Sequence, residues 1–456
     1  MELSLNPGHS LGPIELGSLL WNVLSTLRAE QVRFKHVQIC WEAEKPATGY
    51  ILLSITSPPT RLLFEGVHQR LLFIEAHHST SHERQPPGHS PALGEWIHYQ
   101  NKPIAHAVGP NEPGVTLRVI HRLFGPTYPP APHTSHQKEM VVSYPGVAFS
   151  FSHEVLSRVI LSVQPIGEDF KGDEGEKVQL TEAYFRPRMP LYMSSIDGDL
   201  KSARIKLGRL DLEEPTLITF RFHSSSPNRE IADVKVVVGR STSEDILCEF
   251  GAPLRTFWKE DDRMKIHTHL RSSGRSTGQP EDPNPYFMSY FNLGIDFLID
   301  PITNVVVKIV LHSNIPGEVL FARYSRCPWS LCSMDEDVDV AISTDKAAHI
   351  NQQIRASFIQ DEWETEEKPE GPMDTGKLCE SFSSHAAVGS PDGNARKVSA
   401  TTTTLSNMIE PAMLLDRTAD VVDDGLVLTR PTRLYGHPGI VLEVTEDDDV
   451  ETVWLF

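Results

Sequence analysis

The side chains best suited to bind a metal stand close together near the end of the first fifth of the chain. His77, His78, His82 and Glu83 are residue types that coordinate zinc. Their spacing matches no established zinc pattern, and the stretch from 77 to 91 is rich in His, Ser and Pro, which is typical of a solvated loop. We therefore assign no metal and expect no cofactor.

The cysteines and the acidic pairs also favour ordinary roles. Cys327 and Cys332 are separated by Pro-Trp-Ser-Leu, which is wider than the Cys-x-x-Cys spacing of redox and zinc sites. The total of five cysteines is odd and small for a disulfide scaffold. Asp261-Asp262 and Asp447-Asp448-Asp449 could bind a cation, but carboxylates in turns are usually solvated.

Nucleophilic and phosphate-binding motifs give no support for catalysis. No serine in a Gly-x-Ser-x-Gly context stands on a predicted strand-to-helix turn, and no Gly-rich loop of the Walker or dinucleotide type follows a strand. We expect no enzymatic activity, and an unrecognised enzyme with a carboxylate or histidine site between structural units is kept as a third alternative.

The net charge of the chain limits which classes of partner it can bind. The chain has 456 residues with 42 basic and 61 acidic side chains, which gives a net charge of −19. Phosphate contacts need a clustered basic face, so nucleic acid is not an expected partner. The anionic leaflet would also repel this chain unless another subunit contacts the membrane. The first ten residues lack the pattern of a signal peptide, so we expect a cytoplasmic protein.

The elements expected around these residues begin with a helix. Leu16, Leu19, Leu20, Val23, Leu24 and Leu27 follow the spacing of one buried helical face within residues 16–30. Strands are predicted at 32–41, 50–55, 61–65 and 71–76. A helix at 115–124 and a strand at 140–151, broken at Pro145-Gly146, follow the same order. A helix at 243–250 and a final hairpin at 439–456 complete the set of predicted elements.

Two helix endings are alike. Leu-Phe-Gly-Pro from Leu123 and Glu-Phe-Gly-Ala-Pro from Glu249 each end a predicted helix and precede aromatic-rich strands. This sequence pattern is similar to a helix–Gly-x-Pro–strand unit of small bacterial outer-membrane lipoproteins. Glycine followed by proline is, however, common after any helix. We predict an α+β fold of several helix-plus-antiparallel-meander units, possibly divergent repeats, with long disordered insertions.

The predicted organisation is best given as residue ranges. The units are 1–76, 112–165 and 239–330, the last with an insert at 268–285. Between and after them we expect a loop-rich linker, a strand-rich segment, a short connection, a disordered insertion and the C-terminal strands, at 77–111, 166–238, 331–360, 361–404 and 405–456.

The amino-acid sequence between Phe257 and Tyr324 is distinctive. It contains Lys259, Asp261, Met264, Lys265, Ile266 and His267, then Tyr-Phe-Met-Ser-Tyr-Phe-Asn-Leu-Gly from Tyr286, and then the run from Leu311 to Gly317 with His312 and Asn314. It resembles the phagosome (phagophore) assembly factor family of eukaryotic proteins. The resemblance extends to residues 11–76, where Leu62, Phe64, Gln69, Arg70, Leu71, Ile74 and Glu75 fit the family pattern.

The resemblance implies a non-enzymatic cytosolic adaptor in autophagy. It implies recruitment to the phagophore assembly site in complex with a β-propeller protein of the breast-carcinoma-amplified-sequence type, and indirect association with phosphoinositide membranes. An alternative reading is a Golgi-associated protein-trafficking factor. Lys259, Asp261, Met264, Lys265, Ile266, His267, His312 and Asn314 are the predicted partner-binding residues. An edge strand protected by its charges is the simpler explanation for the run 259–267.

Overall fold

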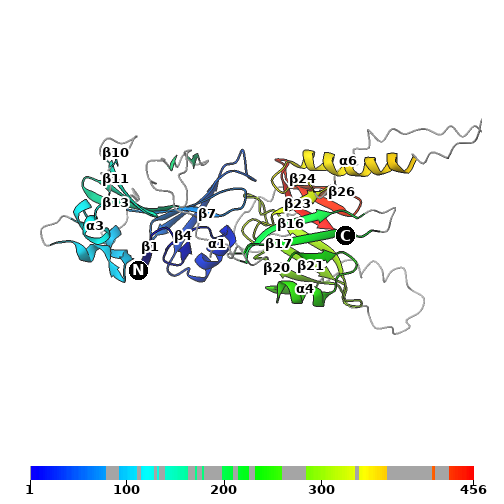
Figure 1. Cartoon of the computed structure of the whole chain (residues 1–456), viewed down its shortest axis with the longest axis horizontal. Coiled ribbons are helices and arrows are strands. Elements are labelled where there is room, and N and C mark those ends of the chain that lie inside the picture. Colours follow the sequence, from blue (N-terminus) through cyan, green and yellow to red (C-terminus); the bar gives the residue numbers. More distant parts are fainter. Residues whose placement is uncertain are drawn as a thin grey trace, which may run out of the picture.

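The chain folds into two halves that lie side by side along the long axis of the molecule. The computed structural model describes residues 2–78, 92–109, 114–127, 131–132, 139–162, 170–171, 177–178, 198–208, 214–224, 232–258, 284–333, 338–366, 413–415 and 431–456. The N-terminal half (blue to cyan) lies at the left of Figure 1, and the C-terminal half (green to red) lies at the right.

The main sheet of the N-terminal half has eight antiparallel strands in the order β10-β11-β12-β13-β7-β6-β5-β4. They are β4 Lys35–Trp41, β5 Ile51–Ser57, β6 Thr60–Phe64, β7 Leu71–His77, β10 Ala131–Pro132, β11 Glu139–Tyr144, β12 Val147–Ser152 and β13 Val155–Ser162. Strands β7 and β13 pair with Ile74 opposite Leu161, which joins two meanders that are separate in the sequence. Strand β4 forms one edge of the sheet.

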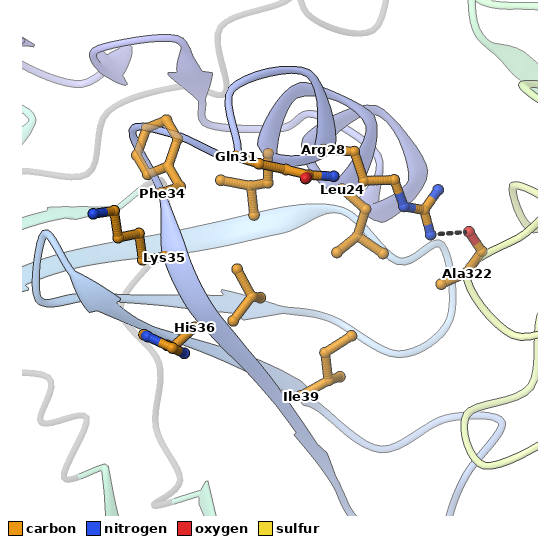
Figure 2. A pocket seen from close by; sticks show the side chains of 10 residues that line it. Leu24, Arg28, Gln31, Phe34, Lys35, His36, Ile39 and Ala322 are labelled. Atoms are coloured by element: carbon orange, nitrogen blue, oxygen red, sulfur yellow. Dashed lines mark hydrogen bonds between the residues drawn. The ribbon is translucent and has the colours of Figure 1, made fainter. Parts of the chain in front are cut away.

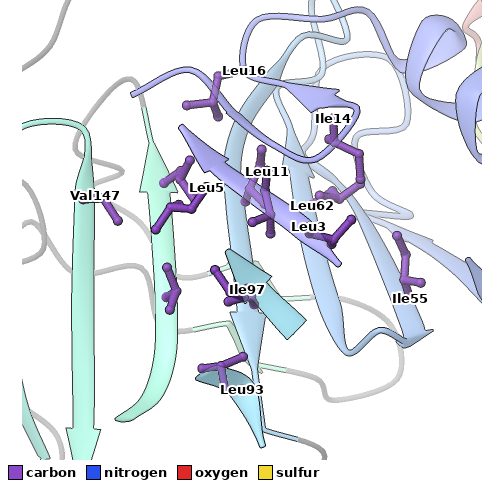
Figure 3. Packing of buried hydrophobic residues seen from close by; sticks show 14 of the residues in the cluster. Leu3, Leu5, Leu11, Ile14, Leu16, Ile55, Leu62, Leu93, Ile97 and Val147 are labelled. Carbon is purple, nitrogen blue, oxygen red and sulfur yellow. The ribbon is translucent and has the colours of Figure 1, made fainter. Parts of the chain in front are cut away.

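A smaller sheet and four helices cover one face of this main sheet. The small sheet has the order β3-β2-β1-β8-β9, with β1 Leu3–Asn6, β2 Ser10–Leu11, β3 Ile14–Glu15, β8 Ile97–Tyr99 and β9 Lys102–Pro103. The helices are α1 Leu20–Ala29, α2 Leu93–Trp96, the 3-10 helix η1 Ile104–Ala107 and α3 Leu117–Phe124. Figure 3 shows Leu3 and Leu5 packed with Ile97, Leu62 and Val147 in the shared core. Beyond this half, β14 Phe170–Lys171 pairs with β15 Lys177–Val178.

The C-terminal half also combines a large and a small sheet. The large sheet has eight antiparallel strands in the order β19-β20-β21-β22-β28-β27-β26-β25. They are β19 Arg255–Trp258, β20 Tyr286–Tyr290, β21 Ile295–Ile299, β22 Val306–His312, β25 Met413–Leu415, β26 Thr432–His437, β27 Ile440–Val444 and β28 Val450–Leu455. Strand β21 begins at Ile295, after the turn that follows β20.

The small sheet of the C-terminal half has the order β18-β17-β16-β23-β24, and β23 lies parallel to β16. Its strands are β16 Leu200–Lys206, β17 Leu217–Phe222, β18 Val234–Val237, β23 Trp329–Cys332 and β24 Asp339–Ile342. The rings of Phe220 and Phe297, whose centroids are 6.4 Å apart, connect the two sheets within one core. Helices α4 Ser243–Phe250 and α6 Ala347–Glu366 complete the half. The predicted short connection at 331–360 thus contains β24 and the start of α6.

The two similar helix endings have the same local structure. Gly125 after α3 and Gly251 after α4 adopt φ values of 85° and 75°, where a side chain would be strained. The hydroxyl of Tyr144 donates to Gly125 O at 2.8 Å, and the hydroxyl of Tyr290 donates to Gly251 O at 2.7 Å. Burial raises the pKa of Tyr290 to about 12, so that hydroxyl stays a donor at neutral pH.

The α+β prediction is wrong, because the fold consists mostly of antiparallel sheets. In the described part of the chain 46% of the residues are in strands and 16% in helices. The predicted helices and meanders exist, but the meanders do not stand as separate helix-plus-sheet units. They merge through the β7–β13 and β22–β28 pairs into continuous eight-stranded sheets. The predicted insertions at 268–285 and 361–404 lie largely outside the described residues.

The acidic turn at 447–449 packs against the start of α6. Asp449 Oδ1 accepts a 2.9 Å hydrogen bond from Lys346 Nζ, and Asp448 Oδ2 accepts one of 3.2 Å from Ala348 N. Carboxylates at a helix N-terminus satisfy amide groups that lack a partner inside the helix. This turn therefore attaches the β27–β28 hairpin to α6.

Candidate functional site

The predicted partner-binding residues fall into two groups. Lys259, Asp261, Met264, Lys265, Ile266 and His267 lie outside the described residues. His312 and Asn314 are described, and their exposed fractions are 5% and 3%. Both belong to residues 312–326, which we call the clasp segment because its side chains hold the two halves together.

His312 takes part in a buried cluster within the C-terminal half. Its Nε2 lies 3.0 Å from Asp296 Oδ2, and the Tyr324 hydroxyl donates to the same oxygen at 2.8 Å. The imidazole stacks on the Tyr324 ring with centroids 3.7 Å apart. Burial and the nearby Asp296 carboxylate raise the pKa of Tyr324, which keeps its hydroxyl protonated. This cluster fixes the two ends of the clasp segment on β21.

Asn314 extends from the C-terminal half into the N-terminal half. Its Nδ2 donates to Gln69 Oε1 at 2.6 Å, and Gln69 Nε2 donates back to the Asn314 carbonyl oxygen at 2.8 Å. Its Oδ1 accepts from Ala322 N at 2.7 Å, which closes the intervening loop. Asn314 has a φ of 49°, a left-handed conformation that asparagine tolerates better than most residues. The Asn314–Gln69 pair joins the two halves through a fully buried contact.

Arg326 makes the densest contact between the halves. Its Nε donates to Ser313 O at 2.7 Å inside the clasp segment. Its Nη1 donates to three carbonyl oxygens of the N-terminal half, those of Ala47, Gly66 and Val67, at 2.6, 2.5 and 3.1 Å. Burial lowers the pKa of Arg326 to about 10, although Glu65 and Asp449 oppose this. The guanidinium therefore remains charged at neutral pH while only 6% exposed.

The loop between Asn314 and Tyr324 packs against helix α1 and strand β4. Trp21 Nε1 donates to Arg323 O at 3.1 Å, and Arg28 Nη2 donates to Ala322 O at 3.0 Å. The Phe321 ring lies 6.3 Å from the Trp41 ring between centroids. Phe321 and Ala322 thus become part of the hydrophobic core of the N-terminal half.

An ion pair on the rim adds to this interface. Arg70 Nη1 donates to Asp199 Oδ2 and to Gly17 O, both at 2.9 Å, and both charged side chains are largely buried. Gln69, Asp199 and Arg326 were not among the predicted site residues. Arg326 follows Arg323 by three residues, so the local sequence does not distinguish the buried arginine from the exposed one. Nothing in the local sequence indicates that Gln69 and Asp199 meet the other half.

The clasp segment has the chemistry of a structural joint. Its hydrogen bonds run to carboxylate, amide and backbone carbonyl oxygens of the chain, and His312, Asp296 and Tyr324 are enclosed in the core. Among the described residues, His312 Nδ1 and Arg326 Nη2 are buried without a hydrogen-bond partner. His312 and Asn314 were predicted to bind a partner. In this structure both side chains are buried, and their hydrogen bonds are made within the chain. Among the residues that the structure describes, no group of three His, Cys, Asp or Glu side chains could hold a metal ion.

Four exposed apolar side chains lie on or near β19, an edge strand of the large C-terminal sheet. Leu247, Leu254, Phe257 and Trp258 are between 42% and 56% exposed. We call these four residues the β19 patch after the strand that carries Phe257 and Trp258, whose side chains point to opposite faces of the sheet. Trp258 contacts the Tyr286 ring at 4.8 Å between centroids, and Arg255 lies over the Phe257 ring. Tyr290 is buried, whereas Tyr286 and Phe287 are half-buried.

No helix within the described ranges is both long and apolar enough to cross a membrane.

Comparisons with known proteins agree on one family. The family model described as phagosome assembly factor 1 matches residues 10–456. A PHAF1 protein of Drosophila melanogaster is 26% identical over 376 residues, which cover 77% of this chain and 80% of that protein. One of Caenorhabditis elegans is 26% identical over 321 residues, covering 67% and 70%, and one of Arabidopsis thaliana is 23% identical over 343 residues, covering 71% and 73%.

No solved structure matches the chain. The family match spans both halves and the clasp segment, and it leaves out β1 at the start of the N-terminal half. The chain belongs to the phagosome assembly factor 1 family.

Proposed function

We propose that this protein is a non-enzymatic adaptor in autophagy that works in complex with a β-propeller protein of the breast-carcinoma-amplified-sequence type. Autophagy induction would bring the pair to the phagophore assembly site. Membership of the phagosome assembly factor 1 family supports the general role. The adaptor mechanism and the partner are our proposal.

The β19 patch is the observation that carries the proposal. Protein interfaces depend on a few large apolar anchors surrounded by polar groups, and Trp is the most enriched of these anchors. Trp258 is 53% exposed and Phe257 is 50% exposed, on an edge strand. The chain continues from Trp258 directly into Lys259, the first of the predicted partner-binding residues. The exposed rings and the predicted contact run thus form one continuous stretch of sequence.

The clasp segment suits an adaptor because it makes the two halves one rigid support. Gln69, Asn314 and Arg326 form five hydrogen bonds across the junction, four of them buried. A support of fixed shape loses little conformational entropy when it binds, which favours affinity. The net charge of −19 opposes direct contact with anionic lipid, so the proposal assigns the membrane contact to the partner.

The test replaces Trp258 with aspartate. Trp258→Asp places a charge at the centre of the β19 patch, where desolvation would oppose docking. We expect the variant to lose co-elution with the propeller protein on size-exclusion chromatography and to form no puncta beside early autophagy markers in starved cells. Its thermal unfolding should resemble that of the original protein, because the side chain is half exposed.

Val338→Asp is the matched control, since Val338 is 55% exposed ahead of β24 in the other sheet. It should keep both co-elution and puncta. A Trp258→Asp protein that still co-elutes would contradict the assignment of the β19 patch. Steady perinuclear ribbons of the unmutated protein under starvation would contradict the autophagy adaptor and support a trafficking role at the Golgi.

A further inference from the structure

Strand β4 is an exposed edge at the junction of the two halves. It pairs with β5 on one side and ends the eight-stranded order of the N-terminal sheet. Val37 on this strand is 38% exposed. An edge strand presents backbone N–H and C=O groups that can pair with an added strand. His36, with a φ of 53°, interrupts the regular strand at its start, so the regular part of β4 begins at Val37.

A cavity of about 550 Å³ opens beside this edge. Val37 and Ile39 line it from alternate positions of β4, Leu24 and Leu27 line it from α1, and Ala322 of the clasp segment closes one end. Figure 2 shows Leu24 of α1, Ile39 of β4 and Ala322 among the side chains around this cavity. Because side chains alternate along a strand, a segment added to β4 would direct every second side chain to this same face. The cavity could therefore hold a bulky apolar side chain of that segment.

The lining of the cavity is basic although the whole chain is acidic. Arg28, Lys35 and His36 line it, and its lining includes no Asp or Glu. The ion pairs of the described residues include none of these three side chains. The net charge is −19, so a cluster of cationic groups without carboxylates is unusual on this surface. Such a rim attracts an acidic partner and repels a basic one.

We propose that β4 and its cavity form a docking groove for an extended acidic peptide that carries one bulky apolar residue. The peptide adds as a ninth strand beside β4, its apolar side chain enters the cavity, and its carboxylates lie near Lys35, His36 and Arg28. Strand addition of this kind takes affinity from the main chain and specificity from the pocket. Lysine on an edge also prevents unwanted sheet pairing, but that role needs no adjoining apolar cavity. The groove is independent of the β19 patch, which belongs to the other half.

The experiment selects displayed peptides of about eight residues, a usual strand length, on the purified full chain. One library places acidic residues around a central apolar position, and a second library is identical but basic. We expect enrichment from the acidic library alone, with Trp, Phe or Leu at the centre. Hydrogen exchange of the chain with the best peptide should show new protection over residues 35–41.

Two variants and one control make the result decisive. Val37→Asp and Lys35→Glu should each weaken the selected peptide by about tenfold or more, which corresponds to one lost favourable contact of about 1.4 kcal/mol. Val32→Asp should bind normally, because Val32 is 90% exposed and lies outside the cavity lining. Failure to enrich acidic peptides, equal enrichment of basic ones, protection elsewhere in the chain, or equal weakening by Val32→Asp would each overturn the proposal.

Discussion

At the scale of single residues, Arg326 shows how a buried charge can fix the arrangement of two halves. Burying a guanidinium costs free energy, which its lowered pKa of about 10 reflects. The cost is offset because four carbonyl oxygens receive its N–H groups. Three of those oxygens belong to turns of the N-terminal half, which only the native docking brings together. Gly66 permits this approach, since a Cβ there would lie 2.1 Å from Gly49 O.

Replacing Arg326 with leucine should therefore destabilise the protein by more than the lost side-chain volume alone would. The variant leaves the carbonyl groups of Ala47, Gly66 and Val67 without their donor in a buried place. We expect a loss of about 3–5 kcal/mol in the free energy of unfolding. Denaturant titration measures it, and a less cooperative transition should accompany the loss because the halves are held by fewer contacts. Arg323→Leu, at an exposed side chain in the same segment, should change stability by less than about 0.5 kcal/mol. Equal stabilities for the two variants would exclude this role of Arg326.

The sequence identified part of this site, and its predicted use in partner binding stays a prediction. The sequence motif around His312 and Asn314 marked both residues as candidates, and the structure places both in the clasp segment. The sequence motif gives no information on burial. His312 and Asn314 were predicted as partner contacts, and in the structure their hydrogen bonds lie within the chain. Gln69 and Asn314 are 245 positions apart, and no local pattern connects residues so distant. Contacts of this kind depend on the docking of whole sheets.

At the scale of elements, helix α1 is the clearest agreement between sequence and structure. The predicted buried face is confirmed at Leu20, Val23, Leu24 and Leu27. Leu24→Ala should cost about 2–5 kcal/mol, because it removes a packed aliphatic side chain against the N-terminal sheet. Thermal or denaturant unfolding would show the change. Leu247→Ala, on the exposed side of α4 with 42% exposure, should leave stability within about 0.5 kcal/mol. An unfolding curve of Leu24→Ala that overlies the original would mean that this face does not carry the core.

Elements with strong local signals were predicted well, and elements that depend on distant partners were missed. The α4 helix begins and ends where predicted, because Thr242 and Asp245 cap it and Gly251 ends it. The strand predicted at 140–151 with a break at Pro145-Gly146 is a hairpin of β11 and β12 that turns at this break. By contrast, β1 is only four residues long and pairs in parallel with β8, more than ninety positions away. Short strands held by such pairings leave little periodicity in the sequence.

At the scale of the whole molecule, strand pairing across the chain decides the fold class. The helices and meanders were recognised one by one, which led to a prediction of separate α+β units. Pairing of β7 with β13 and of β22 with β28 merges them into two large antiparallel sheets. The registers of those pairs, such as Leu311 opposite Val453, join segments that no window of sequence contains together. The resulting molecule presents the β4 groove on one half and the β19 patch on the other.

The most direct test of the account asks whether this chain reaches membranes through a protein partner. Vesicles containing phosphoinositides are floated with the purified chain alone, with the propeller protein alone and with both together. The account predicts that the chain stays unbound by itself, because its net charge of −19 opposes an anionic surface. It should float with the vesicles once the partner is present, and Trp258→Asp should abolish that recruitment while Val338→Asp should not. Tight binding of the chain alone, with little loss at raised salt, would contradict the account.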